Sequence, residues 1–268
     1  ACVMPKRAAH AVRPYPRNRL LMVDGGRLGR KKHTIHGLVE FNISYPRRLI
    51  HDYKAQMGEG PSFSAFLLVC IGQAIASNKQ MHAYRNGINQ LVIFDDVDVN
   101  TLFEVDVAGH KTIRPHIIRG VNRRSVWDIH REIRAFQQQH TQSQESKFIE
   151  WFVLLPGFAR RACLTFLFKN PHWIKEYYGT VLLTSVGMFG EGGGWGIPVS
   201  NHTLQITLGG IAEKPHVVDG RIETRETLSV TVTFDHDVVD GAPAARFTQR
   251  LKELVESGYG LDERKPLI

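Results

Sequence analysis

The chain has 268 residues, 43% of them hydrophobic, and a formal net charge of +8 from 34 Lys and Arg against 26 Asp and Glu. This length and apolar content exclude a disordered polymer and allow one large domain, or two small ones, with a substantial core. Three cysteines, at positions 2, 70 and 163, cannot all pair within one chain, so a reducing, cytoplasmic location is the simplest expectation.

Residues 1–30 hold scattered cations and prolines with little periodicity, which predicts a basic N-terminal arm and does not resemble a signal peptide. A basic cluster closes this segment: Arg27, Arg30, Lys31 and Lys32. Such a cluster suits phosphate groups, either those of coenzyme A or those of a nucleic acid, although a solvated basic surface is favoured over both. No RNA-recognition motif and no zinc-ligand spacing accompanies it, so a nucleic-acid partner is not favoured and no metal is expected.

The central part of the chain alternates between two hydrophobic periods. Helical spacing of apolar residues predicts helices over 46–57, 63–77, 126–139 and 242–256. Alternating or short apolar runs predict strands over 35–43, 91–94, 97–107, 114–118, 181–184, 204–208 and 223–234. Long strands interspersed with helices indicate a mixed α/β fold whose sheet is covered by helices on one face.

Residues 148–168 are strongly apolar, but Pro156, Gly157, Arg160 and Arg161 interrupt them, which argues against a transmembrane helix. The pattern predicts two short helices with an apolar face. Packing on the core is the favoured use of that face; a roof over an acyl pocket and contact with a membrane surface are the alternatives.

A strand-to-helix corner near the C-terminus carries the most informative residues. Polar and apolar residues alternate from 227 to 234, so His236 lies at the end of a strand, and Asp240 lies at the entrance of the following helix, where a carboxylate is favourable. An imidazole, with an ordinary pKa of about 6.5, is suited to general-base catalysis. The spacing His-x-x-x-Asp-Gly alone is a weak signal, because both residue types are common in turns.

The longer string Asp-His-Asp-Val-Val-Asp-Gly-Ala-Pro-Ala-Ala-Arg-Phe, over 235–247, resembles the active-site motif of the dihydrolipoyl acyltransferases. These are the core enzymes of 2-oxo acid dehydrogenase complexes, and their catalytic domain shares its fold with chloramphenicol acetyltransferase. The strand at 180–186 with Gly-Met-Phe-Gly at 187–190, the Pro-x-x-Asn turn at 198–201 and the segment 114–122 are similar to further family motifs in the same order. The resemblance extends from about residue 30 to residue 258.

The resemblance implies a chloramphenicol acetyltransferase-like two-layer sandwich over residues 31–258, with a tail at 259–268. It also implies an acyltransferase that moves an acyl group between coenzyme A and a dihydrolipoyl-type thiol or another small acceptor. His236 would be the general base, Asp240 would orient the site, and Thr184 or, one residue later, Ser185 would stabilise the oxyanion. Because neighbouring strand residues point to opposite faces, only one hydroxyl can serve, and Thr184 is favoured. The family's site lies between subunits, so a homotrimer is expected, with a larger cage left open.

The chain departs from the family pattern at three places. Asp237 stands where the family usually has arginine, and a carboxylate there would favour the charged form of the adjacent imidazole. An apolar insertion occupies about 147–178. The 268 residues show no lipoyl domain or Ala/Pro-rich linker, so the chain is expected to be either an isolated catalytic fragment or a free-standing relative. The insertion favours the free-standing relative, for which a lipoyl group on a separate protein is one candidate substrate. A noncatalytic trimeric scaffold of a dehydrogenase-type complex is the alternative.

Overall fold

The computed structural model describes residues 11–262 except for 18, 108–109, 140–146 and 187–191. Six strands form one mixed sheet in the order β1-β8-β7-β6-β4-β5. Their bounds are Thr34–Asn42 (β1), Val99–Val107 (β4), His110–Ile118 (β5), Val181–Ser185 (β6), Leu204–Val218 (β7) and Arg221–Asp235 (β8). Strand β6 is parallel to both of its neighbours, whereas the pairs β1–β8, β7–β8 and β4–β5 are antiparallel.

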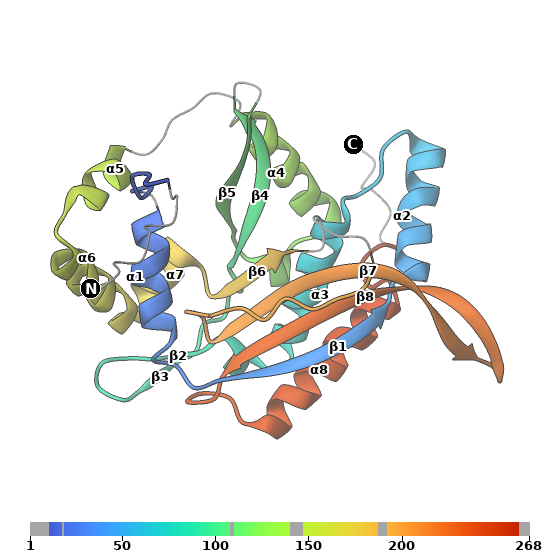
Figure 1. Cartoon of the computed structure of the whole chain (residues 1–268). Coiled ribbons are helices and arrows are strands. Elements are labelled where there is room, and N and C mark those ends of the chain that lie inside the picture. Colours follow the sequence, from blue (N-terminus) through green and yellow to red (C-terminus); the bar gives the residue numbers. More distant parts are fainter. Residues whose placement is uncertain (1–10, 18, 108–109, 140–146, 187–191, 263–268) are drawn as a thin grey trace, which may run out of the picture.

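Four helices pack on the central part of the molecule (Figure 1): α2 (Ser44–Met57), α3 (Phe63–Ala76), α4 (Val126–Gln139) and α8 (Gly241–Glu256). Helix α3 is apolar on nearly all sides because it packs on both α4 and α8. At Gly72 it approaches the backbone of Asn122 so closely that an added Cβ would lie 2.7 Å from the Asn122 nitrogen. Together with Phe41, Phe66 and Phe234, this helix makes the main hydrophobic core.

The helix starts follow local hydrogen bonding. Ser62 caps α3 by accepting a bond from the Ala65 amide at 3.2 Å, and the Asp128 amide donates to the Ser125 hydroxyl at 3.2 Å in front of α4. The Ser125 hydroxyl also donates to the Asp128 carboxylate, which lowers the pKa of Asp128 together with Arg131. The expected helices and strands of the core are confirmed within about four residues, except that the strand predicted over 204–208 continues to Val218.

The segment expected to be an arm without regular structure contains helix α1 (Arg19–Gly29). That expectation was wrong for these residues, because α1 is fixed by tertiary contacts: its buried Asp24 carboxylate accepts a bond from the Arg160 guanidinium of α6 at 2.9 Å. The expected tail likewise begins later than position 258, since Leu261 is buried in the core and its carbonyl accepts a bond from the Tyr53 hydroxyl.

The apolar insertion folds as helices, as predicted, with α5 (Lys147–Leu154), α6 (Gly157–Lys169) and α7 (Pro171–Tyr178). Its inner face packs on a small second sheet, β2 (Tyr84–Arg85) with β3 (Leu91–Val92), through a cluster of Tyr84, Phe94 and Ile174. Two 3-10 turns, Lys79–His82 and Val121–Arg123, complete the described elements. The inner face of the insertion therefore packs on a small cluster that is separate from the main hydrophobic core.

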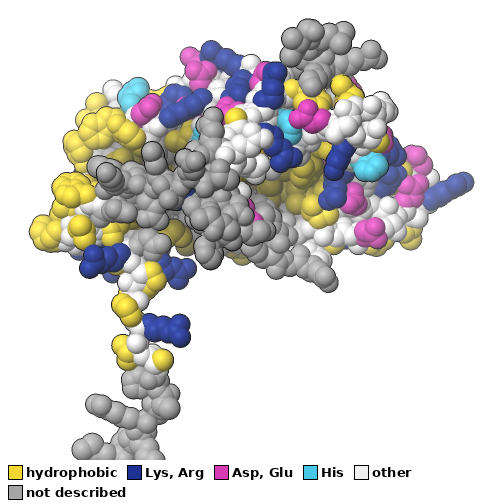
Figure 2. Space-filling view, turned by 90° about the horizontal axis from the view of Figure 1, so that it is seen from above, with side chains coloured by type: hydrophobic (Ala, Val, Ile, Leu, Met, Phe, Trp, Pro, Cys, Tyr) yellow, Lys and Arg dark blue, Asp and Glu magenta, His cyan; other side chains and the backbone are white. Residues whose placement is uncertain are grey.

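The outer face of the insertion stays exposed, and hydrophobic side chains gather with Lys and Arg on that side of the molecule (Figure 2). The exposed apolar residues of these three helices are Trp151, Leu154, Phe158, Phe166, Trp173 and Tyr177. Within the described residues, none of the helices has the length and apolarity needed to cross a membrane.

Candidate active site

The strand-to-helix corner after β8 is built by backbone hydrogen bonds. The amides of Val238 and Val239 both donate to the Asp235 carbonyl at 3.0 Å, and the His236 amide donates to the carbonyl of His33, just before β1, at 2.7 Å. The turn is thus closed on itself and tied to the neighbouring strand. The sequence folds this way because Val239 is buried and Val238 is partly buried against the core, while His236, Asp237 and Asp240 remain exposed.

His236 is exposed at this corner, and its ring makes no hydrogen bond to any described residue. Asp240 is the N-cap residue of α8 in extended backbone conformation, and its carbonyl accepts a bond from the Ala244 amide at 3.0 Å. Its side chain makes no capping bond and is exposed. Both predicted residues therefore lie at one edge of the sheet with side chains open to a ligand or a second chain.

The two acidic residues beside His236 have other partners. Asp235 is buried and forms an ion pair with Lys32, and the Asp237 carboxylate lies 2.9 Å from Nδ1 of His33. The hydrogen bond and charge of Asp237 raise the pKa of His33, and the His33 hydrogen bond lowers the pKa of Asp237. Asp237, which stands where the family usually has arginine, is thus paired with His33. This pair was not predicted from the sequence.

The two candidate hydroxyls lie at the end of β6. Thr184 is half-buried, and its Oγ1 lies 3.2 Å from Oγ1 of Thr207 in β7, whereas Ser185 is exposed. Buried Val181 and Leu183 point toward the helix-covered face, so Thr184 lies on the opposite face. The predicted Gly-Met-Phe-Gly segment that follows, 187–190, lies outside the described residues.

Within one chain, the Thr184 hydroxyl and the His236 imidazole lie far apart. Thr184 is opposite Thr207, which is opposite Thr231, and His236 follows Thr231 by five residues. With a rise of about 3.3 Å per residue and a strand spacing of about 4.8 Å, the two backbones are roughly 15–20 Å apart. A site that uses both groups therefore needs two chains.

A buried polar layer on the face of the sheet opposite the core helices was not predicted from the sequence. Strand β8 buries Thr227, Ser229, Thr231 and Thr233 on one face, while its other face packs in the core. Part of this layer is covered by residues 192–196, which approach β7 so closely that a Cβ at Gly209 would lie 1.9 Å from the Gly194 carbonyl. The alternation of Thr and Ser over 227–233 was the available signal, but it is also the pattern of an ordinary half-exposed strand.

A pocket of about 210 Å³ lies beside the His236 turn. Its residues come from the end of α1, the small sheet, the insertion and the turn itself: Leu28, Lys31, Lys32, Tyr84, Arg85, Phe168, Ile174, Asn201, Thr203, Asp235, Asp237 and Val238. The pocket combines an apolar wall with cations and two carboxylates. Among the described residues, no group of three or more His, Cys, Asp or Glu is placed to hold a metal ion.

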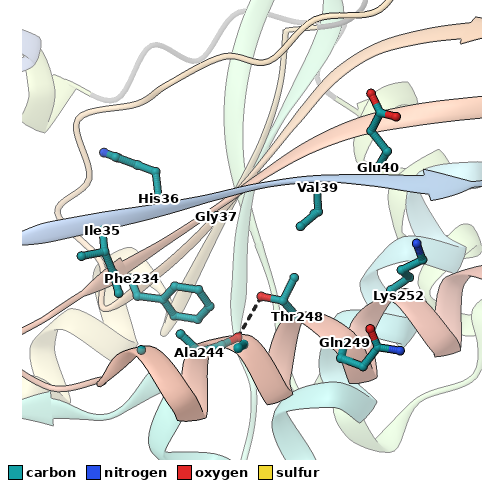
Figure 3. Close-up of a pocket in the computed structure, with 12 residues that line it drawn as sticks. Ile35, His36, Gly37, Val39, Glu40, Phe234, Ala244, Thr248, Gln249 and Lys252 are labelled. Carbon is teal, nitrogen blue, oxygen red and sulfur yellow. Dashed lines mark hydrogen bonds between the residues drawn. The ribbon is translucent and has the colours of Figure 1, made fainter.

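A wider groove of about 600 Å³ lies on the other face of the sheet, between β1 and α8. Figure 3 shows Ile35, Val39 and Phe234 pointing toward α8, whereas His36 and Glu40 point away from it. The dashed line marks the 2.8 Å bond from the Thr248 hydroxyl to the Ala244 carbonyl. The groove contains none of the predicted site residues, so it is not the candidate active site.

Residues 175–261 match the family model of the 2-oxoacid dehydrogenases acyltransferase (catalytic domain), and this span contains all four predicted site residues. The dihydrolipoyllysine-residue succinyltransferase component of the mitochondrial 2-oxoglutarate dehydrogenase complex of Saccharomyces cerevisiae is 27% identical over 98% of this chain and 52% of that protein. The chain thus spans about half the length of this relative.

Two solved structures define the fold. The cubic core of the pyruvate dehydrogenase multienzyme complex superposes with a TM-score of 0.67 and 18% identity, covering 97% of this chain and 99% of that one. A chloramphenicol acetyltransferase superposes with a TM-score of 0.51 and 13% identity, covering 87% and 94%. These confirm the predicted chloramphenicol acetyltransferase-like sandwich. The chain is thus similar to the dihydrolipoyl acyltransferases of 2-oxo acid dehydrogenase complexes and has the fold of their catalytic domain.

Proposed function

We propose that the chain is an acyl-CoA-dependent acyltransferase that uses a dihydrolipoyl-type thiol as its second substrate. The observation that carries this proposal is the exposed His236, held by its backbone at a closed strand-to-helix turn inside the segment that matches the family model. A ring free of other partners is available to a substrate proton. The yeast relative is a dihydrolipoyllysine-residue succinyltransferase, which supports a dihydrolipoyl group as the acceptor.

The proposed reaction needs one general base, which accepts the proton of the acceptor thiol. His236 removes the proton of the acceptor thiol as its sulfur attacks the thioester carbonyl of the acyl-CoA, and a tetrahedral oxyanion forms. The intermediate collapses with cleavage of the bond between the carbonyl carbon and the coenzyme A sulfur, and the leaving thiolate takes the proton back from the imidazolium. The acyl group ends on the acceptor, and the histidine returns to its neutral form.

Thr184 supplies a hydrogen bond to the oxyanion. Its hydroxyl lies on the face of the sheet opposite the core helices, 3.2 Å from the Thr207 hydroxyl, and with Thr207 as the donor of this bond the Thr184 proton is left for the oxyanion. A single donor of this kind is worth about 3 kcal/mol in comparable sites. Asp240, at the same turn as His236, is the positioning residue of the pair, acting through hydrogen bonds and not through proton transfer.

The site is shared between subunits of a homotrimer. The separation of Thr184 and His236 along the sheet supports this, because a neighbouring chain must supply one of the two groups. The same fold forms a cubic core in the pyruvate dehydrogenase complex, which supports self-association. The lipoyl group then comes from a lipoyl-bearing domain that docks at the trimer.

The test is transfer of acetyl and succinyl groups from coenzyme A to dihydrolipoamide, with free coenzyme A and the acylated acceptor quantified by chromatography. We expect turnover by the parent and a loss of about 100-fold or more for His236→Ala, the usual contribution of a positioned base. A matched control, His51→Ala, removes an exposed histidine of α2 and keeps full activity. Turnover that survives His236→Ala contradicts the mechanism, and a trimer that binds coenzyme A without any turnover favours the scaffold.

A further inference from the structure

Helices α1 and α6 enclose a basic groove of about 660 Å³ on the side of the molecule that holds the insertion. Its walls are lined by Asp24, Arg27, Leu28, Lys31, Arg161, Ala162, Thr165, Phe166 and Lys169. Four of these side chains are cationic and only one is acidic. The groove is therefore positively charged, and part of its lining is apolar.

The single acid in the groove is already neutralised. Asp24 is buried and accepts a 2.9 Å bond from Arg160, and Arg161 lies 3.9 Å from its other oxygen. Arg27, Lys31 and Lys169 are exposed and form no ion pair with any described residue. The three exposed cations thus point to an anionic ligand, since unpaired like charges that face one groove repel one another until an anion binds.

The basic groove adjoins the pocket that lies beside the His236 turn. Leu28 and Lys31 line both this groove and the 210 Å³ pocket, and that pocket is also lined by Asp235, Asp237 and Val238 of the His236 turn. In the wall of the pocket, Oδ1 of Asn201 is buried and accepts no hydrogen bond from the described residues. A ligand that fills both cavities would place an anionic end in the groove and a narrow, amide-bearing end beside His236.

We propose that the groove between α1 and α6 binds the nucleotide end of the acyl-CoA, a proposal that rests on the acyltransferase function proposed above. The ribose phosphate and pyrophosphate of coenzyme A face Arg27, Lys31, Arg161 and Lys169. The adenine lies against Phe166, whose ring is 65% exposed. The pantetheine arm passes Lys31 into the pocket, where one of its amide N–H groups donates to Oδ1 of Asn201 and its thioester reaches the His236 corner.

The first test measures binding without catalysis. Adenosine 3′,5′-bisphosphate, which carries the 3′-phosphate and the first 5′-phosphate of coenzyme A but no pantetheine and no thiol, is titrated into the parent trimer and into the triple variant Arg27→Gln, Lys31→Gln, Lys169→Gln. These side chains are exposed, so the variant keeps its fold, which circular dichroism and the oligomeric state verify. We expect a Kd at least about tenfold higher in the variant, a difference that grows at low salt. Lys54→Gln changes an exposed lysine of α2 that forms no ion pair with any residue the structure describes; it is the control and leaves the Kd unchanged.

The second test compares acetyl-CoA with S-acetylpantetheine, which lacks the nucleotide. We expect the parent to prefer acetyl-CoA and the ratio of the two kcat/KM values to fall about tenfold in the triple variant. If the parent and the triple variant have the same Kd for the bisphosphate and the same ratio of kcat/KM values, the groove does not bind the nucleotide end of acyl-CoA, and this proposal is overturned. If the parent binds the bisphosphate through these cations but transfers no acyl group, the groove stands and the proposed function fails.

Discussion

At the scale of single residues, the candidate base is fixed by its backbone and not by its ring. The His236 amide is bonded to His33, and the preceding Asp235 is held by Lys32. This arrangement limits the freedom of the turn while leaving both imidazole nitrogens available to substrate. Holding a catalytic group in place without using its reactive atoms lowers the cost of reaching the transition state.

The two neighbouring hydroxyls of β6 give a sharp comparison. We expect Thr184→Val to lower kcat about 100-fold with little change in the KM for acyl-CoA, because an oxyanion donor acts in the transition state. Ser185→Ala, one residue later and on the other face, keeps kcat within about twofold of the parent. Steady-state kinetics of both variants decide between them. A larger loss for Ser185→Ala would assign the role to Ser185 and contradict Thr184.

The His33–Asp237 pair should give a small pH-dependent contribution to stability. The pKa of His33 is raised in the fold, so its contribution is complete below the unfolded value of about 6.5 and disappears as the pH rises through the folded pKa. The difference in melting temperature between parent and Asp237→Asn is therefore expected to be largest near pH 5–6 and to vanish near pH 8. Thermal unfolding across this range measures it. A difference in melting temperature that stays constant with pH would show that folding does not change the pKa of His33 through this pair.

At the scale of elements, the strongly periodic helices and strands were predictable from sequence, because each buries one regular face. Helix α1 was not, since its cations and glycines carry little periodicity and its position depends on a bond between Asp24 and Arg160, 136 residues apart in the chain.

The candidate site was likewise predictable only where its residues belong to a local sequence motif. His236, Asp240 and the hydroxyl strand could be found from local motifs, whereas the partners Lys32, His33 and Thr207 come from pairing between strands that no local pattern encodes.

Two buried histidines hold the junction between α7 and β6, the strand that carries Thr184. Nδ1 of His82 lies 3.0 Å from the Thr180 hydroxyl, and Nε2 of His202 donates to the Tyr178 carbonyl at 3.1 Å. Burial lowers the pKa of both histidines to about 4, so they are neutral in the fold at pH 7. Protonating either ring would break a bond at this junction or leave a charge buried.

This junction predicts acid sensitivity. Unfolded histidines take up protons below about pH 6.5 but the folded ones only near pH 4, so the free energy of unfolding falls with acidification by up to about 1.4 kcal/mol per pH unit for each residue. Melting temperatures of the parent, His82→Gln and His202→Gln between about pH 5 and 8 test this. Each variant is less stable at pH 7 but has a shallower slope. Equal slopes in all three proteins would contradict the role of these histidines.

At the scale of the whole molecule, several apolar surfaces remain uncovered in one chain. The β7–β8 hairpin extends away from the body in Figure 1 and exposes Val217 and Ile222 near its tip, where Asp219 and Gly220 adopt positive φ. The outer face of α5–α7 is a second such surface. A homotrimer would bury some of this area, and contact of the insertion with a membrane surface stays a prediction.

The central claim is that each active site takes His236 from one subunit and Thr184 from its neighbour. The most direct measurement mixes two inactive variants, His236→Ala and Thr184→Val, by unfolding them together and refolding them, with each variant refolded alone as the control. Random assembly of a trimer places an intact pair at about a quarter of the sites, so we predict recovery of about a quarter of the parent activity. Mixed trimers that remain as inactive as the separate variants would contradict a site shared between subunits.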